Sequence, residues 1–217
     1  MIKKVFFSLY LFILSIFFSI ILILNSSTFI HNFFIRFTNL DSITDLSIKN
    51  IETDYKQVVN YLRFPWINDL KLNYFSMSTG GMFHFQEVKN IFSLIFISFF
   101  IIILIGILLY YLYDKTFITN LVSSFNFYFY FNFSFIIIFL GMMFFNFSSL
   151  FTLFHHIFFN NNYWLFNPIK DSIILVLPEN FFMLCAILII CIILFISFSC
   201  KLYYNKNKNF FNFSIKN

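Results

Sequence analysis

Four long apolar runs separated by polar segments dominate the pattern of the chain. The first run covers residues 5–24 and contains no charged residue. At about 1.5 Å of rise per residue, a helix of this length crosses the roughly 30 Å hydrocarbon core of a bilayer. Three further runs lie at about 91–113, 124–149 and 181–199. The pattern predicts an all-α polytopic membrane protein with four transmembrane helices.

Two longer polar segments separate these runs, at residues 25–90 and 150–180, and a polar tail covers 200–217. Within the first segment, apolar residues recur at helical spacing and predict a short amphipathic helix. They are Ile51, Tyr55, Val59 and Leu62. Pro65 ends this helix, because proline lacks an amide donor. A segment of this size cannot form a core of its own, so it is expected to be a small cap on the membrane bundle.

Glycine and asparagine residues give further local expectations. Gly80 and Gly81 predict a flexible turn before a helix that begins at about Met82. Residues 114–120 predict a short turn between the second and third spans. Small residues in the spans favour close backbone approach, and asparagine amides favour hydrogen bonds to neighbouring helices. The residues concerned are Gly106, Gly141, Asn126, Asn132 and Asn146.

Composition agrees with a membrane protein. The chain has 217 residues, of which 60% are hydrophobic and 11% charged, and its mean hydropathy is +0.85. A soluble domain cannot bury that much apolar surface. The net charge of +5 comes from basic residues that flank the apolar runs, not from one basic face, so no nucleic-acid partner is expected. The three cysteines, all in the last run, match no metal-binding spacing.

The distribution of charge predicts the orientation of the chain. The two termini and the 114–120 turn share one side of the membrane, which has seven lysines and one acid, Asp114. The lysines are Lys3, Lys4, Lys115, Lys201, Lys206, Lys208 and Lys216. The positive-inside rule therefore predicts cytoplasmic termini and places the cap and the 150–180 loop outside the cell.

Two histidines are expected to meet at the outer surface. His84 precedes the second apolar run by seven residues, and His155 follows Ser148 by seven, so both lie about 10 Å beyond the spans on continuous helices. Paired imidazoles suit general acid and base catalysis, because their unperturbed pKa is nearest neutrality. His156 points about 100° away from His155 on a helix, so only one of them faces His84.

Other interpretations of the histidines remain open at this point. Histidines at a headgroup boundary often have only an interfacial role, and zinc binding lacks a ligand pair at fixed helical spacing. His31 has no patterned neighbours and is interpreted as structural.

Three segments carry a resemblance to a known family. They read NYLRFPW, FSMSTGGMFHFQEVKNIF and LFHHIFFNNNYWLFNPIKDSIILVLPENFF, and they span roughly Asn60 to Phe182. They resemble the bacterial lipoprotein intramolecular transacylases, which are integral membrane proteins with four helices and an extracellular cap. Two positions depart from the family pattern: Asn167 stands where the family commonly has Asp, and His156 where it commonly has Glu.

The resemblance implies a diacylated lipoprotein as substrate and no cofactor or metal. In that family an acyl chain moves from the sn-2 glyceryl position to the α-amino group of the N-terminal cysteine, giving a lyso-form lipoprotein. By position, the catalytic histidines of the family correspond to His84 and His155. Glu87 is expected to orient His84, and Lys89 to act as a headgroup-level anchor. Further supporting or cleft-lining residues are expected at Phe154, Phe158, Phe159, Tyr163, Trp164, Asn167 and Asp171.

A different class of function is also compatible with the residues alone. A non-enzymatic assembly factor or partner-binding subunit would use the 150–180 loop as a docking surface. A transporter is disfavoured, because no span has a charged residue near its middle.

Overall fold

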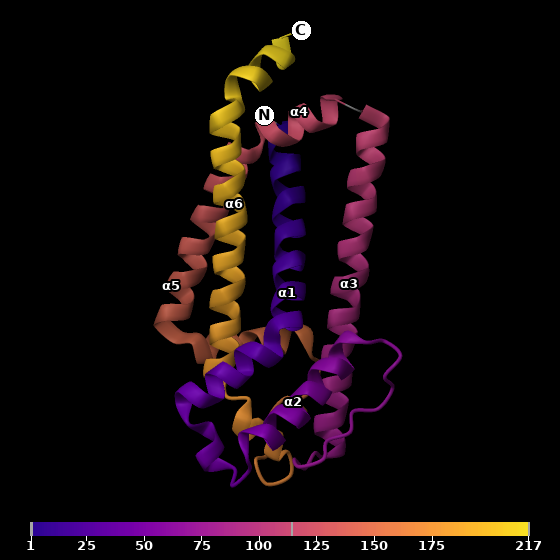
Figure 1. Ribbon diagram of the computed structural model, residues 1–217, viewed down its shortest axis with the longest axis vertical. Helices are drawn as coiled ribbons and strands as arrows, with labels where there is room; N and C mark the ends of the chain where they lie inside the picture. The colour runs from indigo at the N-terminus through magenta and orange to yellow at the C-terminus, as the bar shows by residue number, and fades with distance from the viewer. Residues whose placement is uncertain (1, 114, 217) are drawn as a thin grey trace. The chain divides into compact units, whose positions relative to one another are not determined.

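The structure is a computed structural model that describes residues 2–113 and 115–216, and this part of the chain is helical without any strand (Figure 1). The elements are α1 (Ile2–Thr38), the 3₁₀ helix η1 (Leu40–Ile43), α2 (Ile48–Arg63), α3 (Thr79–Tyr113), α4 (Lys115–Ser123), α5 (Phe125–Phe158), the 3₁₀ helix η2 (Ser172–Val176) and α6 (Glu179–Lys216). Four helical stretches of the described chain are long and apolar enough to cross a membrane: Ile2–Thr38, Thr79–Tyr113, Thr116–Phe158 and Glu179–Lys208. The predicted all-α class with four membrane helices is confirmed.

The chain divides into two compact units. One consists of Met1–Ile20, Phe96–Phe145 and Ile187–Asn217, and the other of Ile21–Ile95 and Asn146–Ala186. We call the first the apolar unit and the second the histidine unit, because His31, His84, His155 and His156 all belong to it.

Side chains within the apolar unit correct several sequence expectations. Gly106 accommodates the Tyr10 side chain, whose hydroxyl donates to the Ile102 carbonyl at 3.2 Å, and not a neighbouring backbone. A Cβ atom on Gly141 would meet nothing within 4 Å, so the predicted close approach there is wrong. Asn132 donates its amide to the Tyr128 carbonyl of its own helix at 2.8 Å, and not to a neighbouring helix.

The connection between the second and third spans is also more regular than expected. Residues 115–123 form α4, which is a helix and not a short turn. Position 114 lies outside the described residues. A hydrogen bond from the Asn126 side chain to a neighbouring helix stays a prediction.

In the histidine unit, α1 continues past the apolar run and packs against α2 (Figure 1). Asn32 of α1 donates to the Glu52 carboxylate of α2 at 3.0 Å. Ser47 caps the first turn of α2, and the helix ends at Arg63, before Pro65. The predicted amphipathic helix is confirmed, because the four apolar residues that define it are all buried.

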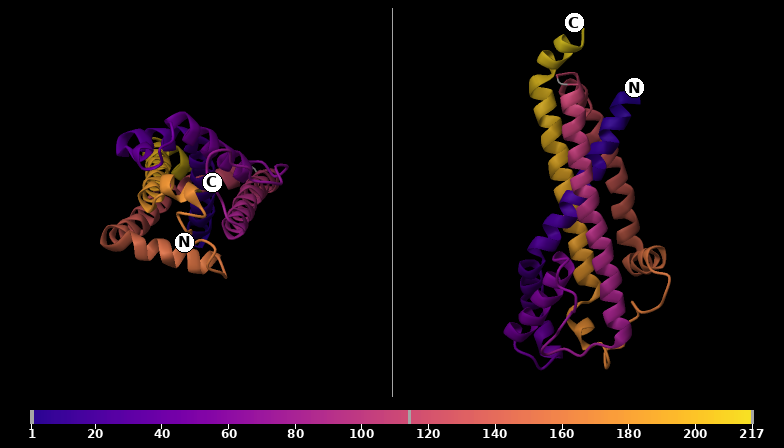
Figure 2. Two further views of the ribbon diagram at one scale, coloured as in Figure 1. Left: turned by 90° about the horizontal axis from the view of Figure 1, so that it is seen from below. Right: turned by 90° about the vertical axis from the view of Figure 1, so that its right-hand side faces the viewer.

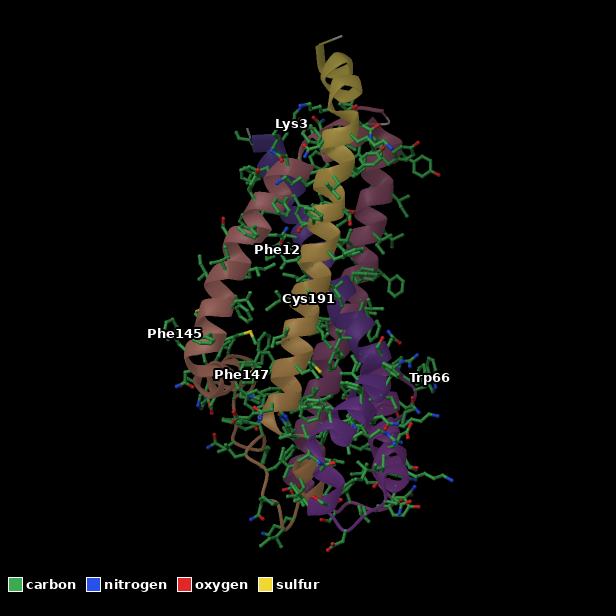
Figure 3. The ribbon with its side chains drawn as sticks, turned by 60° about the vertical axis from the view of Figure 1, so that its left-hand side comes forward. Lys3, Phe12, Trp66, Phe145, Phe147 and Cys191 are labelled. Carbon is green, nitrogen blue, oxygen red and sulfur yellow. The ribbon has the colours of Figure 1, made fainter. Side chains whose placement is uncertain are left out.

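A buried aspartate holds the segment that follows α2. Asp54 accepts hydrogen bonds from the backbone amides of Asn73, Tyr74 and Phe75 at 2.8, 2.7 and 2.9 Å. Three amide donors satisfy a buried carboxylate without a basic partner. Trp66 projects from the same segment and is 72% exposed (Figure 3).

Helix α3 begins earlier than predicted and includes both glycines. Gly80 and Gly81 lie in its first turn, so the expected flexible turn is wrong. Their small size serves packing, since a Cβ on Gly80 would lie 2.8 Å from the Tyr163 ring, and one on Gly81 would meet the Asp171 carboxylate. The 150–180 loop therefore lies directly against the start of α3.

Helix α5 is interrupted at Asn146, whose φ of −163° and ψ of 88° are not helical. The Asn146 side-chain oxygen accepts from the Ser149 amide at 2.9 Å, which is the geometry of an N-cap. The residue thus starts a second helical segment, and its predicted bond to a neighbouring helix is wrong. This segment carries His155 and leads into the loop shown in orange in Figure 2.

Candidate active site

Helices α3 and α5 bring His84 and His155 together. Their ring centroids lie 5.8 Å apart, with the ring planes inclined by 35°. Both imidazoles are buried. His84 precedes Lys89 and the apolar run of α3, and His155 follows the interruption of α5 at Asn146. Both histidines therefore lie beyond the apolar runs 91–113 and 124–149 that we take as the membrane spans.

Aromatic rings enclose His84. Phe159 meets it edge-on at 4.6 Å and Phe166 at 5.5 Å. Phe159 also lies 5.6 Å from His155, so one buried ring contacts both imidazoles. Such a wall excludes water from the pair, and it strengthens electrostatic interactions there.

A hydrogen bond fixes the tautomer of His155. Its Nδ1 lies 2.7 Å from the carbonyl oxygen of Phe151, one turn earlier on α5. A carbonyl only accepts, so Nδ1 carries the proton and, in the neutral ring, Nε2 has the free lone pair. The Trp164 indole stacks on the same imidazole, with centroids 4.6 Å apart. His155 is therefore oriented on two sides and able to accept a proton at Nε2.

His156 occupies a different environment. It is exposed and meets the edge of Trp164 at 5.5 Å. Of the two neighbouring histidines on α5, His155 is the one that faces His84, as the helical spacing predicts.

The surroundings keep both paired histidines neutral at neutral pH. Burial, together with the smaller effect of a positive charge on His155, lowers the pKa of His84 to about 4. Burial also lowers the pKa of His155, against the opposing effects of the Phe151 carbonyl and the Glu179 carboxylate. Of the two histidines, His155 is therefore the one whose protonation is favoured by a nearby carboxylate, that of Glu179.

Glu87 forms its hydrogen bond with the 150–180 loop. Its Oε1 accepts from the Asn161 side-chain amide at 2.8 Å. Its Oε2 is buried and has no hydrogen-bond partner among residues 2–113 and 115–216. The causes that shift the pKa of His84 are burial and His155. The carboxylate is therefore held by the 150–180 loop, and an orienting effect of its charge on His84 stays a prediction.

Lys89 is engaged within the protein. Its ammonium group donates to the carbonyls of Pro65, at 3.4 Å, and Ile67, and lies 4.4 Å from the centre of the Tyr61 ring. These contacts attach the segment after α2 to α3. A headgroup contact of Lys89 stays a prediction.

Asp171 and Asn167 position the loop against the start of α3. Asp171 accepts from the amide of Ser78, just before α3, at 2.7 Å, and from the amide of Asn167 at 3.3 Å. A carboxylate at a helix N-terminus is favourable, because the helix dipole is positive there. Asn167 accepts from the Ile169 amide at 2.9 Å. Asn167 therefore stabilises the turn between residues 167 and 171 through its own hydrogen bonds.

The predicted cleft-lining aromatic residues differ in exposure. Phe154, Phe158 and Tyr163 are exposed, and Tyr163 packs edge-on against Phe83 at 5.4 Å. Trp164 is half-buried, and its Nε1 is buried without a partner in the described chain. Trp164 is thus part of the wall around His155, in addition to any interfacial role.

Sequence reasoning missed several residues of this site. Asn161 lies in a run of three asparagines that indicated only a turn, and Phe166 was one phenylalanine among 40. Glu179 lies at the start of α6 and accepts from the Ser148 hydroxyl at 3.3 Å. Nothing in the sequence pattern indicated its effect on His155.

The fold and the site define a multi-pass helical membrane protein with two buried, neutral histidines side by side. The family model described as "Lipoprotein intramolecular transacylase Lit" matches residues 5–182. The chain therefore belongs to the lipoprotein intramolecular transacylase family, and it is an enzyme of the acyltransferase class. This membership removes the alternative of a non-enzymatic subunit.

Solved structures agree with this assignment. The chain is similar to the membrane-integral lipoprotein intramolecular transacylase Lit from Bacillus cereus, with a TM-score of 0.79 and 29% identity over 96% of this chain and 97% of that chain. Two further structures of that protein, in which a histidine is replaced by arginine or by alanine, have TM-scores of 0.71 and 0.69. They are 29% and 30% identical and cover 97% and 95% of this chain, and 94% and 96% of theirs. No curated protein matched the chain.

Proposed function

We propose that this enzyme moves an acyl chain within one diacylated lipoprotein, from the sn-2 glyceryl ester to the α-amino group of the N-terminal cysteine. The product is a lyso-form lipoprotein. The observation that carries the proposal is the His84–His155 pair, with Nε2 of His155 left free by the bond from Nδ1 to Phe151. An amine nucleophile and an ester leaving group require one group that accepts a proton and one that delivers it.

The reaction balances with one proton transferred. The amine nitrogen attacks the ester carbonyl carbon while His155 Nε2 takes the amine proton. The C–N amide bond then forms, and the C–O bond to glycerol breaks. The proton passes through His84 to the departing glyceryl oxygen. Since a positive charge on His155 disfavours one on His84, only one of the two rings is positively charged at a time.

The intramolecular geometry supplies much of the rate. Both reacting groups belong to one substrate molecule, so holding them together replaces an encounter between two molecules. The exposed rings of Phe154 and Phe158 are suited to contact the lipid part of the substrate, because they are apolar, Phe154 lies 5.4 Å from His155, and Phe158 lies 4.7 Å from Phe154.

The site is proposed to lie at the extracellular membrane interface, with both termini in the cytoplasm. The excess of lysines on the side of the termini supports this orientation. Lipoproteins modified with diacylglycerol would then reach the site laterally, with their acyl chains still in the bilayer.

Expression in a bacterial host that makes only diacyl lipoproteins tests the proposal. Mass spectrometry of a reporter lipoprotein is expected to show N-acyl lyso-form product with the unaltered chain and none with His84→Ala or His155→Ala. His156→Ala is the matched control and is expected to retain conversion. Normal conversion by both of the first two variants, at equal membrane levels, would disprove the catalytic assignment.

A further inference from the structure

The Glu87 carboxyl group is only half satisfied. One oxygen, Oε1, accepts from Asn161 at 2.8 Å, and the other is buried without a partner within the described parts of the chain. Leaving an acceptor buried and unpaired is costly, and the cost is greater for a charged group than for a neutral one. The arrangement therefore favours a cationic or strongly donating group from outside the protein.

The nearest basic residue on α3, Lys89, does not pair with the second oxygen of Glu87. Lys89 is two positions further along α3, and residues two apart do not share a helix face. Its ammonium group is already bound to the Pro65 and Ile67 carbonyls and lies over the Tyr61 ring. Glu87 thus differs from Asp54, whose carboxylate is satisfied by three backbone amides.

Glu87 belongs to the surroundings of the histidine pair. It follows His84 by three residues, which places both on one face of α3. Its partner Asn161 comes two residues after Phe159, the ring that contacts both imidazoles. Glu87 is therefore connected to the histidine pair through α3 and through the 150–180 loop.

We infer that Glu87, fixed by Asn161, binds the α-ammonium group of the N-terminal residue of the substrate. The inference rests on the proposed function, because it identifies the cation as the amine that becomes acylated. Before the chemical step the bound ammonium releases one proton to solvent, and the neutral amine still donates a hydrogen bond to the carboxylate. The second proton, lost when the nitrogen attacks the ester, goes to His155 Nε2. Glu87 thus acts as a positioning residue that keeps the nitrogen lone pair directed at the ester. A primary ammonium fits this role, whereas a hydroxyl or an amide lacks the charge.

Binding of two matched lipopeptides tests this role without turnover. One carries a free α-amine on its diacylglyceryl cysteine, and in the other a hydroxyl replaces that amine. The full-length protein is expected to bind the amine about 10- to 100-fold more tightly, the range for a hydrogen bond to a charged group. In Glu87→Gln the ratio of affinities is expected to fall to about 1, and in Glu87→Asp to an intermediate value.

Glu52→Gln provides a matched control. Glu52 also accepts from an asparagine amide in the histidine unit, at 3.0 Å from Asn32, but it has no buried unpaired oxygen among the described atoms. This variant is expected to keep the full preference for the amine. A Glu87→Gln protein with the unaltered preference, or a Glu52→Gln protein that loses it, would overturn the inference.

A pH series on the unaltered protein gives a second test that needs no variant. The α-amino group loses its charge near pH 8, so the preference for the amine is expected to shrink as pH rises from about 6.5 to about 9.5. A preference that does not change over this range would overturn the inference.

Failure of the inference can be distinguished from failure of the proposed function. His155→Ala should still discriminate between the two lipopeptides, although it forms no lyso-form product. If the unaltered protein makes product, and Glu87→Gln prefers the amine lipopeptide as strongly as the unaltered protein does, only the inference fails. If no product forms and the preference depends on Glu87, the ammonium site stands and the proposed reaction fails.

Discussion

Two histidine environments in the same unit of the molecule have opposite characters. His31 is buried between α1 and α2, stacks on Tyr55 with centroids 3.7 Å apart, and donates from Nε2 to the Val176 carbonyl at 2.8 Å. His84 is equally enclosed, yet its Nδ1 is buried without a partner in the described chain. His155 lies beside it and donates from Nδ1, so the lone pair of the neutral ring is on Nε2.

Burial alone therefore does not distinguish a structural histidine from a catalytic one. Burial lowers the pKa of both His31 and His84 to about 4, so the two rings are similar by this measure. They differ in their hydrogen bonds and neighbours. His31 joins helices through a donated bond and ring contacts, whereas His84 faces a second imidazole. The comparison predicts that replacing His31 reduces the stability of the protein and that replacing His84 reduces the rate of the reaction.

The largest effect is expected from the catalytic pair. His84→Ala and His155→Ala should each lower kcat by about 10²- to 10⁴-fold, because a positioned acid or base contributes that much. The melting temperature should change little in comparison, since His84 has an unsatisfied polar atom that its removal eliminates. Single-turnover assays and thermal unfolding of the purified full-length protein provide the two readouts. A loss of rate that parallels a loss of folded protein would contradict the comparison.

His31→Phe should show the opposite behaviour. The substitution keeps an aromatic ring against Tyr55 but leaves the Val176 carbonyl without its donor, which costs about 1–3 kcal/mol. The melting temperature is expected to fall, while kcat per folded molecule stays within about twofold, since general acid–base catalysis does not involve this ring. A large fall in kcat with unchanged stability would show that His31 belongs to the chemistry.

Asn146→Ala tests how the His155 segment is positioned. Loss of the cap on Ser149 should destabilise this segment by about 1 kcal/mol and reduce kcat by about tenfold or less. Asn146→Asp retains a capping oxygen and is expected to behave like the unaltered protein. Hydrogen exchange of the 147–158 amides, measured together with kcat, checks both effects. Equal exchange and equal rates for the two variants would remove the positioning role of the cap.

The smallest expected effect is a shift in the pH dependence. Activity requires neutral His155, so kcat should fall as pH drops through the pKa of His155, which lies below 6.5. The Glu179 carboxylate raises that pKa, and Glu179→Gln should therefore move the acidic limb to lower pH. Ser148→Ala removes only the hydrogen bond to Glu179 and keeps its charge, so its profile should not move. A shift to higher pH in Glu179→Gln would contradict the assigned sign.

The sequence predicts those parts of the molecule that depend on local pattern. Apolar runs predict the four membrane helices, and spacing along α2 predicts its buried face. Helical rise from the ends of two spans predicts that His84 and His155 meet, and the 100° rotation between neighbours selects His155 over His156.

The sequence does not predict contacts between distant segments. Gly80 and Gly81 looked like a turn because the Tyr163 ring and the Asp171 carboxylate that require their small size lie far along the chain. The same holds for the bond between Asn161 and Glu87, since 74 residues separate them. Asn146 was expected to bond across helices, and only the backbone geometry shows that it caps its own segment.

The central claim is that His155 is the base of a neutral histidine pair, and nitrogen NMR of the two imidazoles tests it most directly. In the full-length protein with labelled histidine, assigned by comparison with His84→Ala and His155→Ala, His155 should be protonated at Nδ1 and unprotonated at Nε2 at neutral pH. His84 should stay neutral until the pH approaches 4. A His155 ring protonated at Nε2 at neutral pH, or a positively charged His84, would contradict the account.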